Sequence, residues 1–125
     1  MHSKSSLRRF VAGLGITIVA ITAGACGGGA PDPEQVAAGQ AAFRKTCATC
    51  HGPDAEGMPR LGKNLHDNAF VRGRSDSELV QFIKQGRPAN HPDNERKVDM
   101  PPKGGNPALT EEQMQLIVAY LRSIQ

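Results

Sequence analysis

Two cysteines and a histidine lie within five residues of one another in this 125-residue chain, in the segment Cys47-Ala48-Thr49-Cys50-His51. Two thiols three residues apart, with an imidazole directly after the second, are the sequence form of c-type haem attachment. Each thiol can bond one vinyl side arm of a porphyrin, and His51 can then reach the iron. The segment predicts one covalently attached haem c, held by Cys47 and Cys50, with His51 as a ligand of the iron.

A second candidate iron ligand is Met100, which lies in a long stretch, residues 87–109, that contains five prolines. The methionine thioether is a soft donor that suits the iron of a haem. The prolines fix backbone angles and would hold the sulfur in place. Alone, a loop methionine is more often a packing residue. In a chain that also carries Cys47, Cys50 and His51, Met100 becomes the predicted second axial ligand.

Four other side chains compete for the iron. Met58 lies only seven residues after His51, too close to reach the opposite face of a porphyrin easily. Met114 falls in a predicted helix and is expected in the core. His66 and His91 are loop histidines, for which a solvated side chain is the ordinary state. His91 is the stronger rival of the two, because two histidine ligands would give a haem of lower potential.

Capping patterns predict the helices that must position these residues. Asp32 as a cap with Pro33 in the first turn predicts a helix that runs to about Thr46. A capping box that begins at Ser75 predicts a helix over residues 76–85, and a third cap at Thr110 predicts one from residue 111 to about 124. Residues 68–71 are expected to form a short helical turn.

The helix faces follow from apolar spacing. The inner face of helix 76–85 is predicted to carry Leu79, Phe82 and Ile83. The last helix is expected to bury Leu116 or Ile117, with Tyr120, Leu121 and Ile124. In the first helix, Gly39 costs about 1 kcal/mol relative to alanine. From the residues alone it marks either the close approach of another helix or a tolerated surface glycine.

Residues 1–25 have the pattern of an export signal. Lys4, Arg8 and Arg9 form a positive start, a largely apolar stretch follows, and Ala23-Gly24-Ala25 provides small residues for cleavage. A membrane span needs about 20 apolar residues, and this stretch is shorter. A cleaved signal is therefore predicted, with an uncleaved anchor as the alternative.

Cys26 follows directly on that cleavage pattern, and its surroundings resemble a bacterial lipobox with alanine in place of the commoner leucine. We expect Cys26 to be lipidated and residues 26–31 to act as a flexible tether to a domain over residues 32–125. The alternative is an ordinary signal that is followed by a cysteine. Lipidation would hold the domain at the outer face of the cytoplasmic membrane, and an ordinary signal would release it into the periplasm.

The charge of the chain excludes a class of partners. The chain has 15 Lys and Arg against 12 Asp and Glu, and removal of Lys4, Arg8 and Arg9 with the signal leaves 12 of each. The isoelectric point near 9.0 therefore belongs to the signal. The remaining domain is near neutral, without an arginine cluster or basic and aromatic residues interleaved, so nucleic-acid binding is not expected.

These features together resemble the class I bacterial c-type cytochromes, the mono-haem family with His and Met ligation. The resemblance covers residues 32–125 and rests on the first helix, the Cys47–His51 segment, the Met100-Pro101 loop and the last helix. It implies a small all-α, cytochrome c-like fold of three main helices wrapped around one covalently bound haem. It also implies that His51 and Met100 are axial ligands on opposite faces of the porphyrin.

The resemblance also implies how the terminal helices pack and how the ligand histidine is oriented. The N- and C-terminal helices should cross, with Gly39 allowing the close contact and with Phe43 and Tyr120 packed on it. In the family a backbone carbonyl orients the ligand histidine. Pro59 and the stretch 63–65 both match this pattern in part, and the sequence does not choose between them.

A haem iron with both axial positions filled favours an electron carrier over an enzyme. The expected partners are redox proteins, either a membrane oxidase or reductase complex or a dehydrogenase, with no small-molecule substrate. One alternative is a gas-binding or peroxidase-like haem protein in which Met100 is displaceable. A second is a zinc site made of Cys47, Cys50, His51 and a later histidine, which leaves the Met100 loop unexplained.

Overall fold

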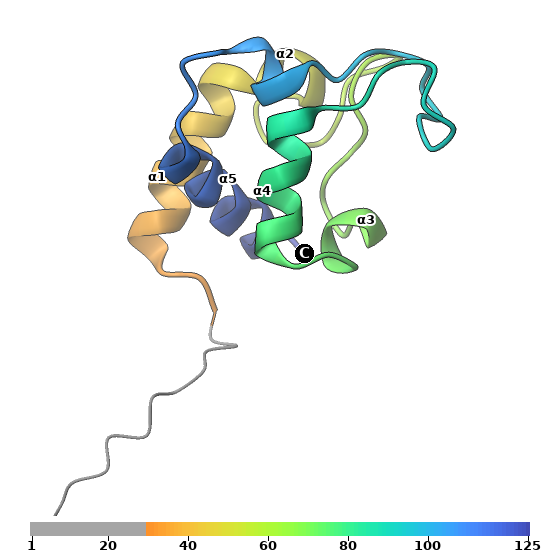
Figure 1. Cartoon of the computed structure of the whole chain (residues 1–125). Coiled ribbons are helices and arrows are strands. Elements are labelled where there is room, and N and C mark those ends of the chain that lie inside the picture. The colour runs from red at the N-terminus through yellow and green to blue at the C-terminus, as the bar shows by residue number, and fades with distance from the viewer. Residues whose placement is uncertain (1–29) are drawn as a thin grey trace, which may run out of the picture.

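The structure, a computed structural model, describes residues 30–125. The predicted signal peptide, Cys26 and most of the tether therefore lie outside the described residues. The helices are α1 (Pro33–Thr46), α2 (Ala48–His51), α3 (Ala69–Arg72), α4 (Asp76–Gln85), the 3-10 helix η1 (Pro102–Gly105) and α5 (Glu111–Ser123) (Figure 1). Within residues 30–125 there is no strand longer than a single bridge, which agrees with the predicted all-α class.

The predicted caps set the helix starts. Asp32 accepts hydrogen bonds from two main-chain N–H groups in the first turn of α1. Complete capping boxes begin α4, from Ser75 to Glu78, and α5, from Thr110 to Gln113. These contacts satisfy N–H groups that have no partner within the helix. They are local in sequence, which is why the expected bounds and the observed ones agree within one residue.

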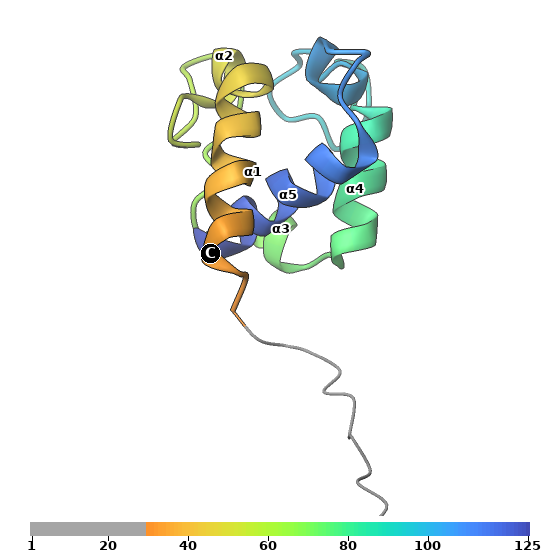
Figure 2. The same cartoon turned by 90° about the vertical axis from the view of Figure 1, so that its left-hand side faces the viewer.

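Helices α1 and α5 cross in both views of the chain (Figures 1 and 2), and Gly39 lies at their contact. A Cβ atom on Gly39 would lie 1.9 Å from the main-chain oxygen of Leu116, so no larger residue fits at this distance. Beside the crossing, the rings of Phe43 and Tyr120 pack with centroids 5.3 Å apart. Of the two explanations for Gly39, the close approach of another helix is the one observed.

The buried core is built mainly from α4 and α5, with Phe43 added from α1. Its members are Phe43, Ala55, Val71, Leu79, Val80, Ile83, Leu109, Met114, Ile117, Val118, Tyr120 and Leu121. Met114 is in the core as expected, and of the pair Leu116 and Ile117 it is Ile117 that is buried. Phe82 differs from the prediction. It is half-buried and turned toward the site described below, so the inner face of α4 uses Val80 in its place.

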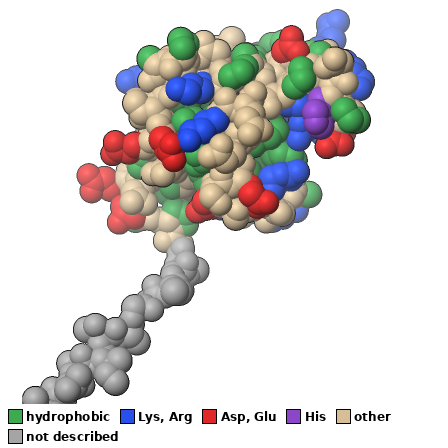
Figure 3. All heavy atoms as spheres, viewed as in Figure 1, with side chains coloured by type: hydrophobic (Ala, Val, Ile, Leu, Met, Phe, Trp, Pro, Cys, Tyr) green, Lys and Arg blue, Asp and Glu red, His purple; other side chains and the backbone are tan. Residues whose placement is uncertain are grey.

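Acidic and basic side chains are intermixed over the face shown in Figure 3. The five ion pairs found among the described residues each join one cation to one carboxylate, as in Arg44–Asp54 and Lys84–Glu111. This distribution fits the near-neutral charge of the domain. In the described part of the chain, no helix has the length and apolar character needed to cross a membrane.

Candidate functional site

A cavity of about 350 Å³ lies between the end of α1, α2, the loop after α2, the end of α4 and the long loop that follows α4. This volume is within the range of sites that hold cofactors. The lining includes Cys47, Cys50, His51 and Met100, so the structure brings all four predicted haem residues to one cavity. Apolar side chains from several elements complete the wall, namely Leu61, Leu65, Phe70, Phe82, Val98 and Pro101.

The histidine segment, residues 47–63, forms one side of this cavity. Cys47 ends α1, and α2 begins at the next residue, so the chain turns within the motif itself. Main-chain hydrogen bonds from Cys50 and His51 to the carbonyl of Cys47 hold that turn at 3.1 and 3.0 Å. Both cysteine thiols are free and half-buried at the cavity wall, as attachment of a porphyrin requires.

The ring of His51 is oriented by the main-chain carbonyl of Lys63, 2.9 Å from Nδ1. A carbonyl oxygen only accepts hydrogen bonds, so Nδ1 must carry the proton and Nε2 is left with a free lone pair. This is the tautomer that an imidazole needs to bind iron. Of the two candidates that the sequence left open, the structure thus assigns the orienting carbonyl to Lys63 and not to Pro59.

Gly62 is a residue of this site that sequence reasoning missed. A Cβ atom there would lie 2.4 Å from the carbonyl oxygen of Cys50 and 2.8 Å from Nδ1 of His51. The main chain of Gly62 donates to the same Cys50 oxygen at 2.9 Å. The absence of a side chain therefore lets the loop lie directly against the cysteine–histidine turn. In the sequence, the only signal for this role is that Gly62 directly precedes Lys63, a candidate for the carbonyl that orients His51.

Burial shifts the pKa values of the motif in the direction of the neutral forms. Burial raises the pKa of the Cys47 thiol to about 11, and the nearby Cys50 adds to the rise. Burial also lowers the pKa of His51, although its hydrogen bond to the Lys63 carbonyl opposes this. A neutral imidazole with a free Nε2 is the form that coordinates a metal.

The methionine loop, residues 87–105, forms the opposite side. Met100 and Arg87 exchange two main-chain hydrogen bonds, of 2.8 and 2.9 Å, in an isolated antiparallel bridge. The bridge fixes Met100 to the residue that follows the last turn of α4 and its terminal Gly86. Pro101 and Pro102 restrict the chain directly after the methionine.

Asn94 holds the methionine loop from within. It is the only buried polar residue among residues 30–125, 7% exposed. Its side-chain nitrogen donates to the carbonyls of Pro88, at 3.0 Å, and Val98, at 2.7 Å. Its side-chain oxygen accepts from the main-chain N–H of Lys97 at 3.0 Å. One side chain thus replaces the regular hydrogen bonds that this loop lacks.

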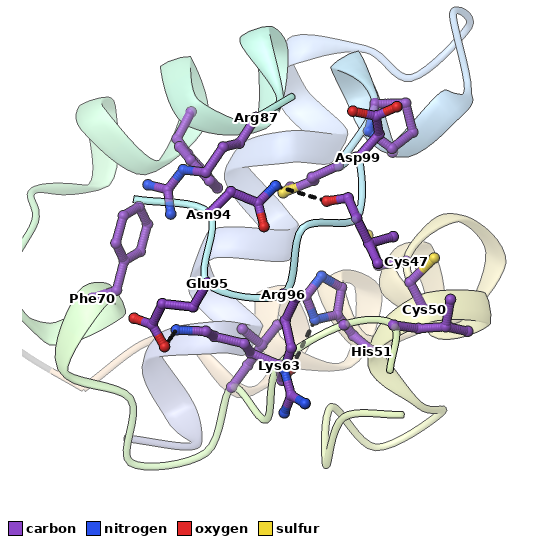
Figure 4. A pocket seen from close by; sticks show the side chains of 18 of the residues that line it. Cys47, Cys50, His51, Lys63, Phe70, Arg87, Asn94, Glu95, Arg96 and Asp99 are labelled. Atoms are coloured by element: carbon purple, nitrogen blue, oxygen red, sulfur yellow. Dashed lines mark hydrogen bonds and ion pairs between the residues drawn. The ribbon is translucent and has the colours of Figure 1, made fainter. Parts of the chain in front are cut away.

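The end of the cavity away from the cysteines holds an aromatic and cationic cluster (Figure 4). The rings of Phe70 and Phe82 lie 4.7 Å apart. The guanidinium of Arg87 lies 4.8 Å from the centroid of each ring. Nearby, Lys63 forms an ion pair with Glu95 at 2.8 Å, which joins the histidine segment to the methionine loop.

The rival ligands lie elsewhere. His91 is outside the cavity lining, and its Nδ1 accepts a hydrogen bond from the Asp93 N–H at 3.1 Å. His66 is exposed, with Nε2 2.5 Å from the Asp54 carbonyl oxygen. Met58 is 39% exposed and does not line the cavity. Within residues 30–125 no three His, Cys, Asp or Glu side chains gather to hold a metal ion, which gives the zinc alternative no support.

The residues present fit a covalently attached haem. Two accessible thiols, a histidine with a free Nε2 and a methionine thioether border a single cavity with a largely apolar wall. The donor set of one imidazole and one thioether is a set that proteins use for haem iron.

Comparison with known protein families gives one match over most of the chain. Residues 34–121 match the family described as cytochrome c oxidase, cbb3-type, subunit III. The cbb3-type oxidase subunit CcoP of Rhodobacter capsulatus is 33% identical over 94 residues, 74% of this chain and 30% of CcoP. FixP of Rhizobium meliloti strain 1021 is 41% identical over 91 residues, 71% of this chain and 30% of FixP. The chain thus spans about 30% of the length of these curated relatives.

A solved structure shows the same arrangement of the chain. Cytochrome cL of the methylotrophic bacterium Methylophaga aminisulfidivorans superposes with a TM-score of 0.55 and 30% sequence identity. The match covers 74% of this chain and 54% of that protein. The fold over about three quarters of the chain is therefore similar to that of a cytochrome c of known structure.

Proposed function

This chain belongs to the class I c-type cytochromes, within the cbb3-type cytochrome c oxidase subunit III family, and from this premise we propose that it is a mono-haem electron carrier. As a member of that family it binds haem c covalently. When bound, haem c supplies a centre that accepts and returns one electron. In our proposal the thiols of Cys47 and Cys50 would hold the porphyrin, and His51 and Met100 would bind its iron.

The observation that carries this proposal is the convergence of these four side chains on one cavity. The Lys63 carbonyl holds the His51 ring in the tautomer that leaves Nε2 free. The Arg87 bridge holds Met100 from the other side. Because these groups leave the iron no open position for a substrate, we infer a carrier that docks transiently with redox proteins, and not an enzyme.

The partners follow from the relatives by inference only. CcoP and FixP are named as subunits of cbb3-type oxidases, so we propose that one partner of this chain is a membrane oxidase complex. We propose a reductase complex or a dehydrogenase as the other redox partner. The match covers about 30% of these relatives, and the proposal accordingly concerns a single haem domain over residues 32–125.

We further propose that residues 1–25 are removed as a signal peptide and that Cys26 carries a lipid, with residues 26–31 as a tether. The domain would then work at the periplasmic side of the cytoplasmic membrane. Membrane fractionation of cells that express the full chain tests this. The wild type should sediment with membranes, and Cys26→Ser should appear in the soluble periplasmic fraction. Equal distribution of both forms would contradict lipidation.

Absorption spectroscopy of the purified holoprotein tests the axial ligands. A pyridine haemochrome spectrum of the c type should report the two thioether bonds, and the oxidised protein should show the methionine-to-iron charge-transfer band. Met100→Ala should lose that band and keep the haemochrome spectrum. Met58→Ala is the matched control, because Met58 lies outside the cavity lining and should change neither signal. A band that survives in Met100→Ala would overturn the assignment.

The same samples separate the carrier from the alternative of a displaceable methionine. If Met100 holds the iron firmly, the reduced wild type should bind carbon monoxide slowly and incompletely at neutral pH. Met100→Ala should bind it at once. Rapid binding by the wild type would favour a gas-binding or peroxidase-like protein.

A further inference from the structure

The guanidinium of Arg87 has no role in the proposed attachment of haem or ligation of iron. The guanidinium is half-buried and lies at the wall of the largely apolar cavity (Figure 4). The faces of Phe70 and Phe82, each 4.8 Å away, fix its position. Its main chain is fixed as well, by the bridge to Met100. Two aromatic rings and the main-chain bridge thus place the guanidinium at the cavity wall.

Arg87 forms no ion pair among the described residues, although its charge attracts the Glu95 carboxylate, which is paired with Lys63. Its one polar contact is a donation from Nη1 to the main-chain carbonyl of Asp93, at 3.2 Å. The other cavity cations differ in this respect, because Lys63 is paired with Glu95 and Arg96 is exposed to solvent. Taking a cation out of water without a counter-charge is costly. Such a site is therefore suited to an anion that enters with the ligand.

The place of Arg87 in the cavity indicates which part of a haem it would meet. Cys47 and Cys50 lie at one end of the cavity, and Arg87 and Phe70 lie at the other (Figure 4). In the porphyrin of haem, the two vinyl groups and the two propionate groups are carried on opposite edges. Thioether bonds to the two cysteines would therefore direct the propionates toward Arg87.

We propose that Arg87 binds a propionate carboxylate of the haem and so joins the seating of the porphyrin to the loop that carries Met100. This inference rests on the proposed function, since it requires a covalently attached haem. A guanidinium matches a carboxylate through two parallel N–H donations. Arg87 is thus a positioning residue, because the same residue binds the carboxylate through its side chain and holds Met100 through its main chain.

Resonance Raman spectroscopy of the holoprotein tests the proposal, because the propionate bending mode responds to hydrogen bonds on the carboxylate. Arg87→Gln should move this mode to lower frequency, and Arg87→Lys should move it by less. Arg74→Gln is the matched control. The guanidinium of Arg74 stacks on the same Phe70 ring, at 3.4 Å, but does not line the cavity, so this variant should leave the mode unchanged.

An unchanged mode in Arg87→Gln would overturn the proposal, and an equal shift in Arg74→Gln would show that only the packing of Phe70 matters. The reduced wild type gives a second test that needs no variant. With arginine labelled by ¹⁵N, the Arg87 side-chain protons should exchange slowly and show nuclear Overhauser contacts to the propionate methylene protons. Absence of these contacts would also overturn it. A pyridine haemochrome assay distinguishes failure of the Arg87 proposal from failure of the proposed function. A missing c-type signal would refute the proposed function, whereas a normal signal with an unchanged propionate mode would refute only the role of Arg87.

Discussion

The histidine segment, residues 47–63, and the methionine loop, residues 87–105, face the same cavity but are held in different ways. In the histidine segment, main-chain contacts are so close that a single added carbon at Gly62 would lie 2.4 Å from the Cys50 carbonyl oxygen. The methionine loop has one such contact, where a Cβ on Gly86 would lie 2.2 Å from the Met100 carbonyl oxygen, but the rest of this irregular stretch is held by the Arg87 bridge and the buried side chain of Asn94. The histidine segment therefore depends on close packing of the backbone, whereas the methionine loop before Met100 depends mainly on hydrogen bonds to one side chain.

This difference predicts two kinds of failure. Damage to the histidine segment should prevent haem attachment, since both thiols and His51 lie within it. Damage to the methionine loop should leave the haem attached and weaken only the second axial ligand. The four substitutions below test that division, in order of decreasing effect.

The largest effect is expected for Gly62→Ala. The added Cβ meets main-chain atoms of Cys50 and the ring of His51, neither of which can move without opening the turn. Overpacking of this kind should cost about 3 kcal/mol or more of unfolding free energy and sharply lower the yield of covalent haem. Urea unfolding and the pyridine haemochrome assay measure both.

Gly73→Ala is the control for that substitution. Gly73 is exposed with an ordinary φ of −79°, and the nearest atom to an added Cβ lies 3.0 Å away. The control should keep nearly wild-type haem content. Equal haem content in Gly62→Ala would show that the histidine segment is more adaptable than its contacts indicate.

Asn94→Ala should have the next largest effect. It removes three hydrogen bonds of a buried side chain and leaves the Val98 carbonyl without its partner, while the Pro88 carbonyl and the Lys97 N–H each keep one main-chain hydrogen bond. Loss of about 2–3 kcal/mol is expected, together with a weaker methionine-to-iron band and an unchanged haemochrome spectrum. A loss of haem in place of the band would reverse the division between the two regions.

Gly104→Ala should be milder. Gly104 has a φ of +63°, and an added Cβ would lie 2.9 Å from Cγ2 of Thr46, an atom of a side chain. The left-handed backbone should cost about 1–2 kcal/mol, and Thr46 can adjust. Thermal unfolding should show a small decrease with both spectroscopic signals retained. A cost as large as that of Gly62→Ala would mean that both sides of the cavity are equally rigid.

The smallest effect is expected for Glu95→Gln. Lys63 lowers the pKa of Glu95 below its ordinary value of 4.5, by donating a hydrogen bond and by charge attraction. Any stabilisation by the pair is therefore fully present above pH 4.5 and is lost as the pH falls through the lower pKa of the folded state. Because the Glu95 side chain is 75% exposed and that of Lys63 41%, the variant should match the wild type at pH 7 within error. A clear difference at pH 7 would show that the pair closes the cavity more firmly than its exposure indicates.

The three long helices, α1, α4 and α5, could be predicted well because their capping signals are local, whereas the four-residue α2 and η1 have no side-chain cap and were not expected. Ser75 with Glu78 and Thr110 with Gln113 set helix starts that the structure reproduces. The face of a helix is harder to predict, because a neighbour decides which side is covered. Phe82 fits an apolar stripe by spacing, yet it lines the cavity beside Phe70, a residue twelve positions earlier.

Main-chain contributions to the site could be predicted least. The Lys63 carbonyl and the Arg87 bridge use backbone atoms that every residue has, so residue type does not mark them. Asn94 is likewise one of several polar residues in a loop until the fold shows that it is buried. Side chains with specific chemistry, such as Cys47 and Met100, could be found from the sequence because few other residue types can replace them.

The helix crossing at Gly39 has a consequence for how such a protein can vary. Among residues 30–125, α5 supplies no side chain to the cavity wall, and α1 supplies only Thr46, at its end. The contact that joins α1 to α5 thus lies outside the cavity wall, and Phe43, which packs on Tyr120, connects it to the His51 ring, with centroids 6.4 Å apart. Evolution, or a designed library confined to the cavity residues, can therefore change the redox properties of the domain while the scaffold is inherited intact.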